Sequence, residues 1–218
     1  MIKENKFKTL VSSITILLPI LFGLIVWNRL PDKIAIHWGI DGNPDQYASK
    51  LFAVVFMPLL LLGVHLICLL ISGLDPKNKG QNKKVQGLVF WIAPAISIFC
   101  AGFVYFDAFK IAFNVSGICI AFLGLMLIVI GNYMPKTKQN YTIGIKVSWA
   151  LHDEQNWNAT HRFAGKLWVI GGILLLPAAF LPGKALPLIF IAILPLVIAP
   201  IIYSFLYHKR HNQDKENN

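Results

Sequence analysis

The sequence predicts an all-α polytopic membrane protein with six transmembrane helices and with cytoplasmic N- and C-termini. Three observations lead to this fold class. The 218-residue chain is 56% hydrophobic and 14% charged, whereas soluble domains carry about 25% charged residues. Its apolar residues are gathered in blocks, and its basic residues are concentrated between alternate blocks. This composition excludes a soluble α/β enzyme, a disordered chain and a secreted disulfide scaffold.

A helix needs about 20 mostly apolar residues to cross roughly 30 Å of hydrocarbon. Six blocks approach this length: 10–27, 51–72, 85–106, 115–134, 166–181 and 186–207. The fifth block is short, so we expect its helix to begin in the polar residues before it. Lysines precede the first block as in a secretory signal, but no small-residue cleavage site follows, and we expect an uncleaved signal anchor.

The distribution of Lys and Arg predicts the orientation in the membrane. If both termini lie on one side, that side holds 15 of the 20 basic residues and the opposite side holds five. Cytoplasmic loops carry the excess of basic residues, so the termini of this multi-pass protein are expected in the cytoplasm. The net charge of +10 reflects this bias. Because no basic stripe lies on a soluble domain, no direct nucleic-acid partner is predicted.

We expect a single membrane domain with two parts. Residues 1–84 form an N-terminal two-helix unit with an extracellular, turn-rich loop at 28–50. Residues 85–218 form a four-helix unit with a cytoplasmic segment at 135–165. Neither loop is long enough for a hydrophobic core of its own. The segment 107–114 is interpreted as a short connector.

The outer loop is predicted to contain a short strand and tight turns. Apolar side chains alternate along 34–38, which is typical of an extended segment. The Asp-Gly pair at 41–42 and the Asn-Pro pair at 43–44 are strong turn signals. Ser49 is placed to cap the second helix.

Metal binding by the outer loop is considered but not predicted. Asp41, Asn43 and Asp45 have the spacing that opens a calcium loop, but the glycine and the final glutamate that such a loop requires are missing. His37 could bind a metal together with these carboxylates, or respond to pH. A hydrogen bond within the turn is the favoured interpretation.

The inner segment carries an apolar residue at every second position from Tyr141 to Leu151. This period of two predicts an extended segment with one apolar face. Asp153 is then expected to cap a helix whose first turn holds Glu154. The apolar positions of that helix continue through Trp157 into the fifth block.

His65 lies near the middle of the second block. An ionisable residue within the membrane is a functional candidate by default, although a neutral histidine hydrogen-bonded between helices is the plainer interpretation. The sequence contains no HExxH or GxSxG motif and no paired intramembrane carboxylates. No enzyme activity, cofactor or metal site is therefore predicted.

Motifs in both loops resemble the SdpI family. The outer stretch LPDKIAIHW at 30–38, followed by GNPD at 42–45 and SK at 49–50, resembles the N-terminal domain of unknown function that accompanies this family. The inner stretch from GNYMPK at 131–136 to THR at 160–162 resembles the SdpI signature itself.

One part of the inner motif departs from the family pattern. The family usually has Arg-Thr-Pro where this chain has Lys146, Val147 and Ser148. Lysine keeps the positive charge but loses the planar fork of arginine. The residues of this chain that match the cytoplasmic family motif are Asn132, Pro135, Asn140, Gly144, Lys146, Trp149, Glu154, Trp157, His161 and Arg162.

The resemblance implies an immunity protein that protects the cell from a secreted, membrane-active peptide toxin of the SdpC kind. It further implies a signalling receptor that, once it has bound toxin, holds a cytosolic autorepressor at the membrane. The candidate toxin contacts in the outer loop are His37, Trp38, Asp41, Gly42, Pro44, Asp45, Tyr47 and Lys50.

Other partners and one alternative function follow from the same residues. The segment 142–151 is expected to recruit the repressor by strand addition, with Lys146 and Arg162 engaging acidic groups. Basic residues on this face are also expected to contact anionic lipids. The alternative is a small transporter or channel, motivated by His65 and by the proline-broken spans.

Overall fold

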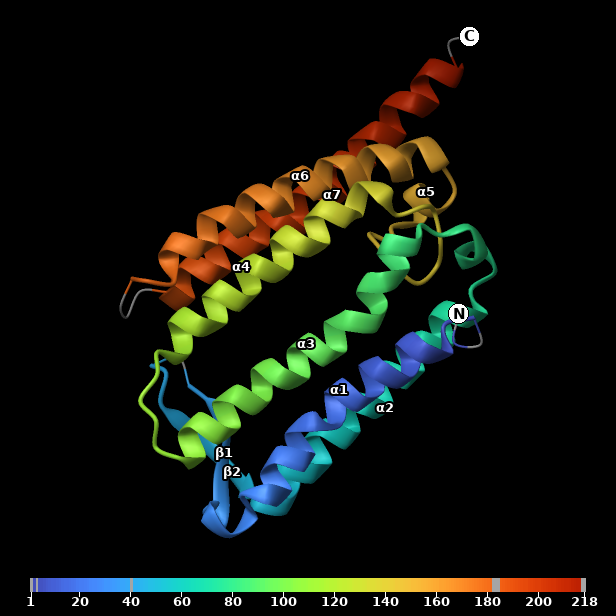
Figure 1. Cartoon of the computed structure of the whole chain (residues 1–218). Coiled ribbons are helices and arrows are strands. Elements are labelled where there is room, and N and C mark those ends of the chain that lie inside the picture. Colours follow the sequence, from blue (N-terminus) through green and yellow to red (C-terminus); the bar gives the residue numbers. More distant parts are fainter. Residues whose placement is uncertain (1, 3, 40, 182–184, 217–218) are drawn as a thin grey trace. The chain divides into compact units, whose positions relative to one another are not determined.

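The computed structural model describes residues 2, 4–39, 41–181 and 185–216 (Figure 1). It is mostly helical, as predicted. Its contacts define two compact units. The first comprises Met1–Gly73 and Gly87–Ser116, and the second comprises Leu74–Gln86 and Gly117–Asn218. The predicted division at residues 84 and 85 follows the loops rather than the contacts and stays a prediction.

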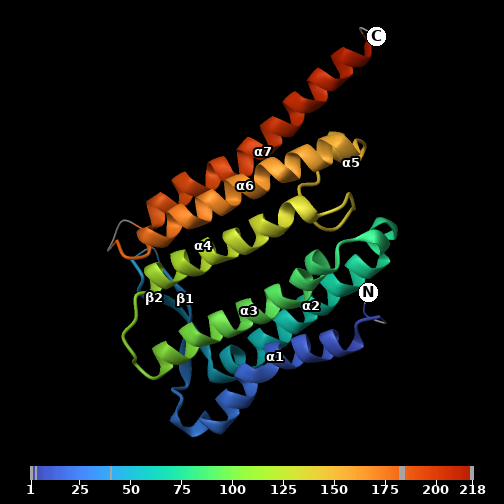
Figure 2. The same ribbon diagram turned by 45° about the horizontal axis from the view of Figure 1, so that its top comes forward.

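The first unit contains α1 (Lys6–Ile25), α2 (Met57–Leu74) and most of α3 (Lys83–Ala108), which lie side by side in Figures 1 and 2. A π-helical turn, Phe52–Phe56, leads directly into α2. The expected cap of this helical segment is present, because the Phe52 N–H donates to Ser49 Oγ at 3.3 Å.

Pro19 lies inside α1, where its missing N–H weakens the helical ladder. Two side chains of α3 bond to carbonyls at this point. Ser97 Oγ donates to the carbonyl of Ile16 at 2.9 Å, and the Tyr105 hydroxyl donates to the carbonyl of Pro19. Such cross-helix bonds let a membrane helix tolerate proline, and here they also join α1 to α3.

A two-stranded antiparallel sheet connects α1 to the π-helical turn. It pairs β1 (Lys33–Trp38) with β2 (Pro44–Ser49), and the register becomes irregular between Ala35 and Trp38. Ile34 and Ala35 are fully buried, and Ile34 belongs to a cluster with residues of the π-helical turn and of α3. The sheet is therefore anchored by an apolar base rather than suspended in a flexible loop.

The second unit contains α4 (Val115–Tyr133), the four-residue helix α5 (Ser148–Leu151), α6 (Glu154–Ala178) and α7 (Ala185–Glu216). Helices α6 and α7 run side by side in both ribbon views. Trp168 of α6 donates its indole N–H to the carbonyl of Leu196 in α7 at 2.8 Å.

Glycines allow α4 and α6 to approach closely. A Cβ atom added to Gly124 would lie 2.9 Å from the carbonyl oxygen of Gly172, and one added to Gly131 would lie 2.9 Å from that of Gly165. Small residues at such positions let membrane helices pack backbone against backbone.

Five helical segments of the described chain are long and apolar enough to cross a membrane: Lys6–Ile25, Phe52–Leu74, Lys83–Ala108, Val115–Lys136 and Ile191–His211. They overlap the first four predicted spans and the sixth. The fifth predicted span lies within α6, which begins at Glu154 in the polar residues, as expected. The count of six spans and the cytoplasmic location of the termini stay predictions.

Candidate functional site

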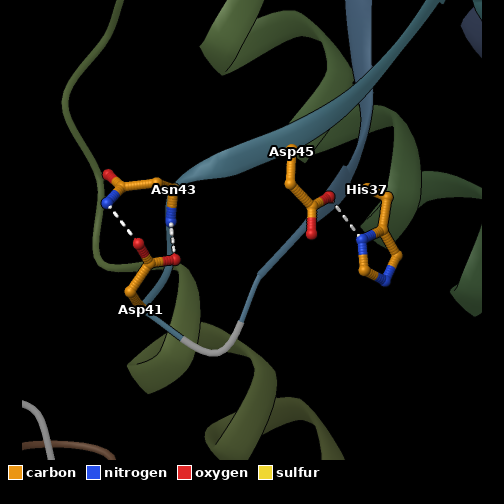
Figure 3. Close-up of polar contacts among 4 residues, drawn as sticks. All are labelled: His37, Asp41, Asn43 and Asp45. Carbon is orange, nitrogen blue, oxygen red and sulfur yellow. Dashed lines mark hydrogen bonds and ion pairs between the residues drawn. The ribbon is translucent and has the colours of Figure 1, made fainter.

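The tip of the β1–β2 hairpin carries two separate polar pairs (Figure 3). His37 Nδ1 lies 2.6 Å from Asp45 Oδ1, which is the hydrogen bond favoured from the sequence. Asn43 donates through its backbone N–H to Asp41 Oδ1 at 3.1 Å and through its side chain to Oδ2 at 2.7 Å. These bonds hold the pKa of the Asp41 carboxyl below its usual value.

The turn chemistry explains this arrangement. Gly42 has a φ of 79°, a conformation that glycine adopts without steric cost, and the Asp41–Asn43 bonds close the turn around it. Each of the two carboxylates is engaged by its own neighbour. Within the described residues, no three His, Cys, Asp or Glu side chains come together in a way that could hold a metal ion.

An open cavity of about 340 Å³ lies between the hairpin and the end of α3, and we call it the outer pocket. Three predicted toxin contacts line it: Trp38, Gly42 and Pro44. The end of α3 and the chain that follows it supply the rest of the wall. The full lining is Trp38, Gly42, Pro44, Asp107, Lys110, Ile111, Ala112, Phe113 and Val115.

A chain of aromatic contacts holds Trp38 in place. Its ring meets Phe103 edge-on at 5.4 Å between centroids, and Phe103 in turn meets Phe113 at 5.2 Å. Phe113 also contacts Phe106 at 5.5 Å. Such contacts add to the energy of burial, so the pocket wall is expected to be rigid.

The other predicted contacts lie outside the pocket. His37, Asp41 and Asp45 are exposed on the hairpin, and Tyr47 is 55% exposed on β2. Lys50 lies at the base of the hairpin, where its Nζ forms an ion pair with Asp32 Oδ1 at 3.0 Å and lies over the Trp27 ring. The outer residues thus form a pocket and an exposed polar tip.

The pocket residues after α3 were missed by sequence reasoning, which treated 107–114 as a connector. Asp107, in the last turn of α3, and Lys110, two residues after that helix, bring opposite charges to the pocket rim. Lys110 has a φ of 55°. A signal was present, because Phe99, Phe103 and Phe106 recur at helical spacing on α3 and point to one aromatic face.

In the second unit, residues 137–147 form a compact loop that we call the inner loop, after its predicted cytoplasmic location. Asn140 is fully buried at its centre. Its Oδ1 accepts from the N–H groups of Thr142 and Ile143, and its Nδ2 donates to the carbonyls of Lys138 and Ile143. One amide side chain therefore organises the whole turn.

Two residues from the segment after α2 form hydrogen bonds to the inner loop. Asp75 Oδ2 accepts from the Tyr141 N–H at 2.8 Å and from Thr142 Oγ1 at 3.1 Å. Gln81 bonds Lys138 twice, donating to its carbonyl at 3.0 Å and accepting from its N–H at 2.9 Å. Neither Asp75 nor Gln81 was a sequence candidate.

His161 joins the inner loop to α6. Its Nδ1 donates to the carbonyl of Trp157 at 2.8 Å, its Nε2 accepts from the Ile145 N–H at 3.0 Å, and its ring stacks on Trp157 at 4.0 Å. The bond from Ile145 requires a neutral ring, because both nitrogens of a protonated ring are donors. Burial lowers the pKa of His161 to about 4, and the hydrogen bond to Trp157 opposes this only in part.

The prediction of an extended segment at 141–151 is wrong. No strand forms among these residues, and Ser148–Leu151 form α5. Gly144 turns the chain with a φ of 116° over the His161 and Trp157 rings. The N–H groups of residues 141, 142, 143 and 145 bond to side chains. These four N–H groups are therefore not available for strand addition.

A second buried group of hydrogen bonds attaches α5 and α6 to α7. Trp149 donates its indole N–H to Ser204 Oγ at 2.9 Å, and Ser204 Oγ donates to Asn156 Oδ1 at 2.7 Å. Asn156 Nδ2 in turn donates to the Ser204 carbonyl. The predicted cap of α6 is confirmed, because the Asp153 side chain accepts from the N–H groups of Gln155 and Asn156.

The inner candidates thus separate into two sets. Five take part in the internal contacts just described: Asn140, Gly144, Trp149, Trp157 and His161. Five are exposed: Asn132, Pro135, Lys146, Glu154 and Arg162.

His65 is buried in the first unit, where its Nε2 lies 2.9 Å from Ser12 Oγ of α1. The expected hydrogen bond between helices is therefore present. Ser12 Oγ also donates to the Thr9 carbonyl, so His65 Nε2 carries the proton in this pair. Among the described residues, its Nδ1 has no hydrogen-bond partner.

Comparison with known proteins agrees with this architecture. Residues 136–204, from the inner loop through most of α7, match the SdpI/YfhL protein family. Residues 14–62, from α1 through the hairpin into α2, match a domain of unknown function, DUF1648. The fold and the two matched regions define a multi-pass membrane protein with a DUF1648 region followed by an SdpI/YfhL region.

The resemblance to the SdpI family is thereby confirmed. The chain is 28% identical over 213 residues to the immunity protein SdpI of Bacillus subtilis (strain 168), an alignment that covers 94% of this chain and 98% of that protein. No solved structure matches the chain.

Proposed function

We propose that this protein confers immunity to a secreted, membrane-active peptide toxin of the SdpC kind. The observation that carries the proposal is its similarity, over nearly the whole of both chains, to a protein named for immunity. No catalytic motif is present in the sequence, so protection is assigned to binding rather than to destruction of the toxin.

We assign toxin recognition to the outer pocket. The pocket combines an aromatic wall, built on Trp38 and Phe113, with the opposite charges of Asp107 and Lys110. An aromatic ring that is already fixed by its neighbours supplies contact area at low cost in conformational entropy. Charged groups at the rim favour binding of a partner with complementary charges. An amphipathic peptide presents both kinds of group.

Sequestration of a cytosolic autorepressor would use side chains of the inner loop, because the backbone N–H groups of residues 141, 142, 143 and 145 are already bonded. Lys77 Nζ lies 4.7 Å from the centroid of the exposed Tyr141 ring, and Lys146 is also exposed. This cationic and aromatic surface fits an acidic partner.

The membrane topology belongs to the same proposal. With α6 as the fifth of six spans, and with 15 of the 20 basic residues on the side of the termini, the outer pocket faces the cell exterior and the inner loop faces the cytoplasm.

Survival of a toxin-sensitive host tests the proposal. Wild-type protein is expected to protect the host relative to an empty vector, and Trp38→Ala is expected to lose most of this protection. The matched control is Trp91→Ala, which truncates an exposed tryptophan of α3 that does not line the pocket. Failure of well-expressed wild-type protein to protect would refute immunity. Equal protection by both variants would refute toxin recognition at the outer pocket.

A further inference from the structure

Exposed polar residues of α6 gather at a second cavity of about 320 Å³, within the second unit. Gln155, Asn158 and Arg162 lie on one face of the helix because they are three and four residues apart. Pro135, in the short helical turn Met134–Lys136 that follows α4, and Tyr207, from α7, complete the lining. We call this cavity the arginine pocket.

The chemistry of the arginine pocket is that of an anion receptor. Arg162 supplies a planar guanidinium with several N–H donors, and the side chains of Gln155, Asn158 and Tyr207 add further donors. None of the five lining residues is acidic. Among the described residues, no hydrogen bond or ion pair engages Arg162, so its donors are available to a ligand.

The position of the arginine pocket along the chain indicates which class of anion it binds. Arg162 precedes the fifth predicted span, 166–181, by one helical turn, and Tyr207 is the last residue of the sixth predicted span, 186–207. Both elements therefore bring the pocket to the level at which lipid headgroups meet a helix. The guanidinium fork matches phosphate oxygens in geometry.

We propose that the arginine pocket binds one phosphate group, supplied by an anionic phospholipid at the cytoplasmic face. Arg162 holds two phosphate oxygens, while the amide donors of Gln155 and Asn158 complete the shell. Tyr207 brings α7 to the same pocket, so the bound lipid contacts both α6 and α7. The site is distinct from diffuse attraction of lysines to the membrane, because it depends on one arginine in a shaped cavity.

Native mass spectrometry of the purified full-length chain tests this proposal. Phosphatidylglycerol, phosphatidylcholine and inorganic phosphate are titrated separately. Wild-type protein is expected to bind one phosphatidylglycerol with clear preference over phosphatidylcholine. Arg162→Gln is expected to weaken this binding about tenfold, because it removes the charge-assisted hydrogen bonds to the phosphate, and Gln155→Ala is expected to weaken it less.

The matched control is Lys84→Gln, which removes an exposed charge from the start of α3, in the same unit. It is expected to bind phosphatidylglycerol as the wild type does. Equal weakening by Lys84→Gln and Arg162→Gln would show diffuse attraction and overturn the proposal, as would unchanged binding by Arg162→Gln. Binding of inorganic phosphate with the same dependence on Arg162 would support the phosphate site and overturn its assignment to lipid.

Discussion

At the scale of single residues, His161 has the clearest chemical signature. Its neutral ring both donates to Trp157 and accepts from Ile145, so protonation removes the acceptor that holds the inner loop. Sequence reasoning found His161 through the family motif but did not find its role. That role depends on Gly144, whose positive φ brings the loop backbone over the ring.

Because of His161, the free energy of unfolding is expected to decrease as the pH is lowered. The folded-state pKa, about 4, lies below the ordinary value of 6.5, so the unfolded state binds more protons below pH 6.5. This contribution to stability is complete above pH 6.5 and is lost as the pH falls toward 4, by about 2 kcal/mol at pH 5.

Thermal unfolding of the detergent-solubilised protein between pH 7.5 and 5 measures this effect. His161→Gln is expected to flatten the dependence, whereas His152→Gln, which alters an exposed histidine, is expected to retain it. A slope that is the same in wild type and His161→Gln would contradict the role of His161.

His65 allows the alternative of a transporter to be tested. Ser12 and His65 pair only with each other and with the Thr9 carbonyl among the contacts observed at the described residues, and replacement of both partners of a buried bond by apolar groups can be nearly neutral. We expect the Ser12→Ala/His65→Leu variant to retain protection. Ion flux in vesicles that depends on His65 would favour the transporter instead.

At the scale of elements, the glycine contacts between α4 and α6 make a sharp prediction. A Cβ on Gly131 would lie 2.9 Å from the Gly165 carbonyl oxygen and 3.0 Å from Trp168 Cβ, so Gly131→Ala must separate the helices. We expect a loss of about 1–3 kcal/mol in stability. The control, Gly102→Ala in α3, meets no atom within 4 Å and is expected to be neutral or slightly stabilising.

The unfolding midpoint in detergent measures both glycine variants. Equal effects at the two positions would show that close packing of α4 against α6 does not stabilise the second unit.

The helices were predictable because bilayer length and hydropathy act on whole blocks of sequence. The start of α6 was predictable from Asp153, since capping is local. The period of two at 141–151 led to a wrong prediction of an extended segment. Such a pattern does not show which groups accept hydrogen bonds from the backbone. Here they come from Asp75, Asn140 and His161, two of which are distant in sequence. The outer pocket was missed for the same reason, because half of its wall follows α3.

At the scale of the whole molecule, the two matched regions coincide with the two structural features that carry the proposal. The DUF1648 region contains the hairpin, and the SdpI/YfhL region contains the whole inner loop. In the proposed topology these features face opposite sides of the membrane. Such an arrangement suits a protein that meets a toxin outside the cell and a partner inside it.

The central claim, that the outer pocket binds the toxin, is tested most directly by site-specific cross-linking in living cells. A photo-crosslinking phenylalanine derivative is placed at position 38 or, as the control, at position 91, and the cells are exposed to the secreted toxin. A covalent product with the toxin is expected from position 38 and not from position 91. Equal products from both positions, or a product from position 91 alone, would contradict recognition at the outer pocket.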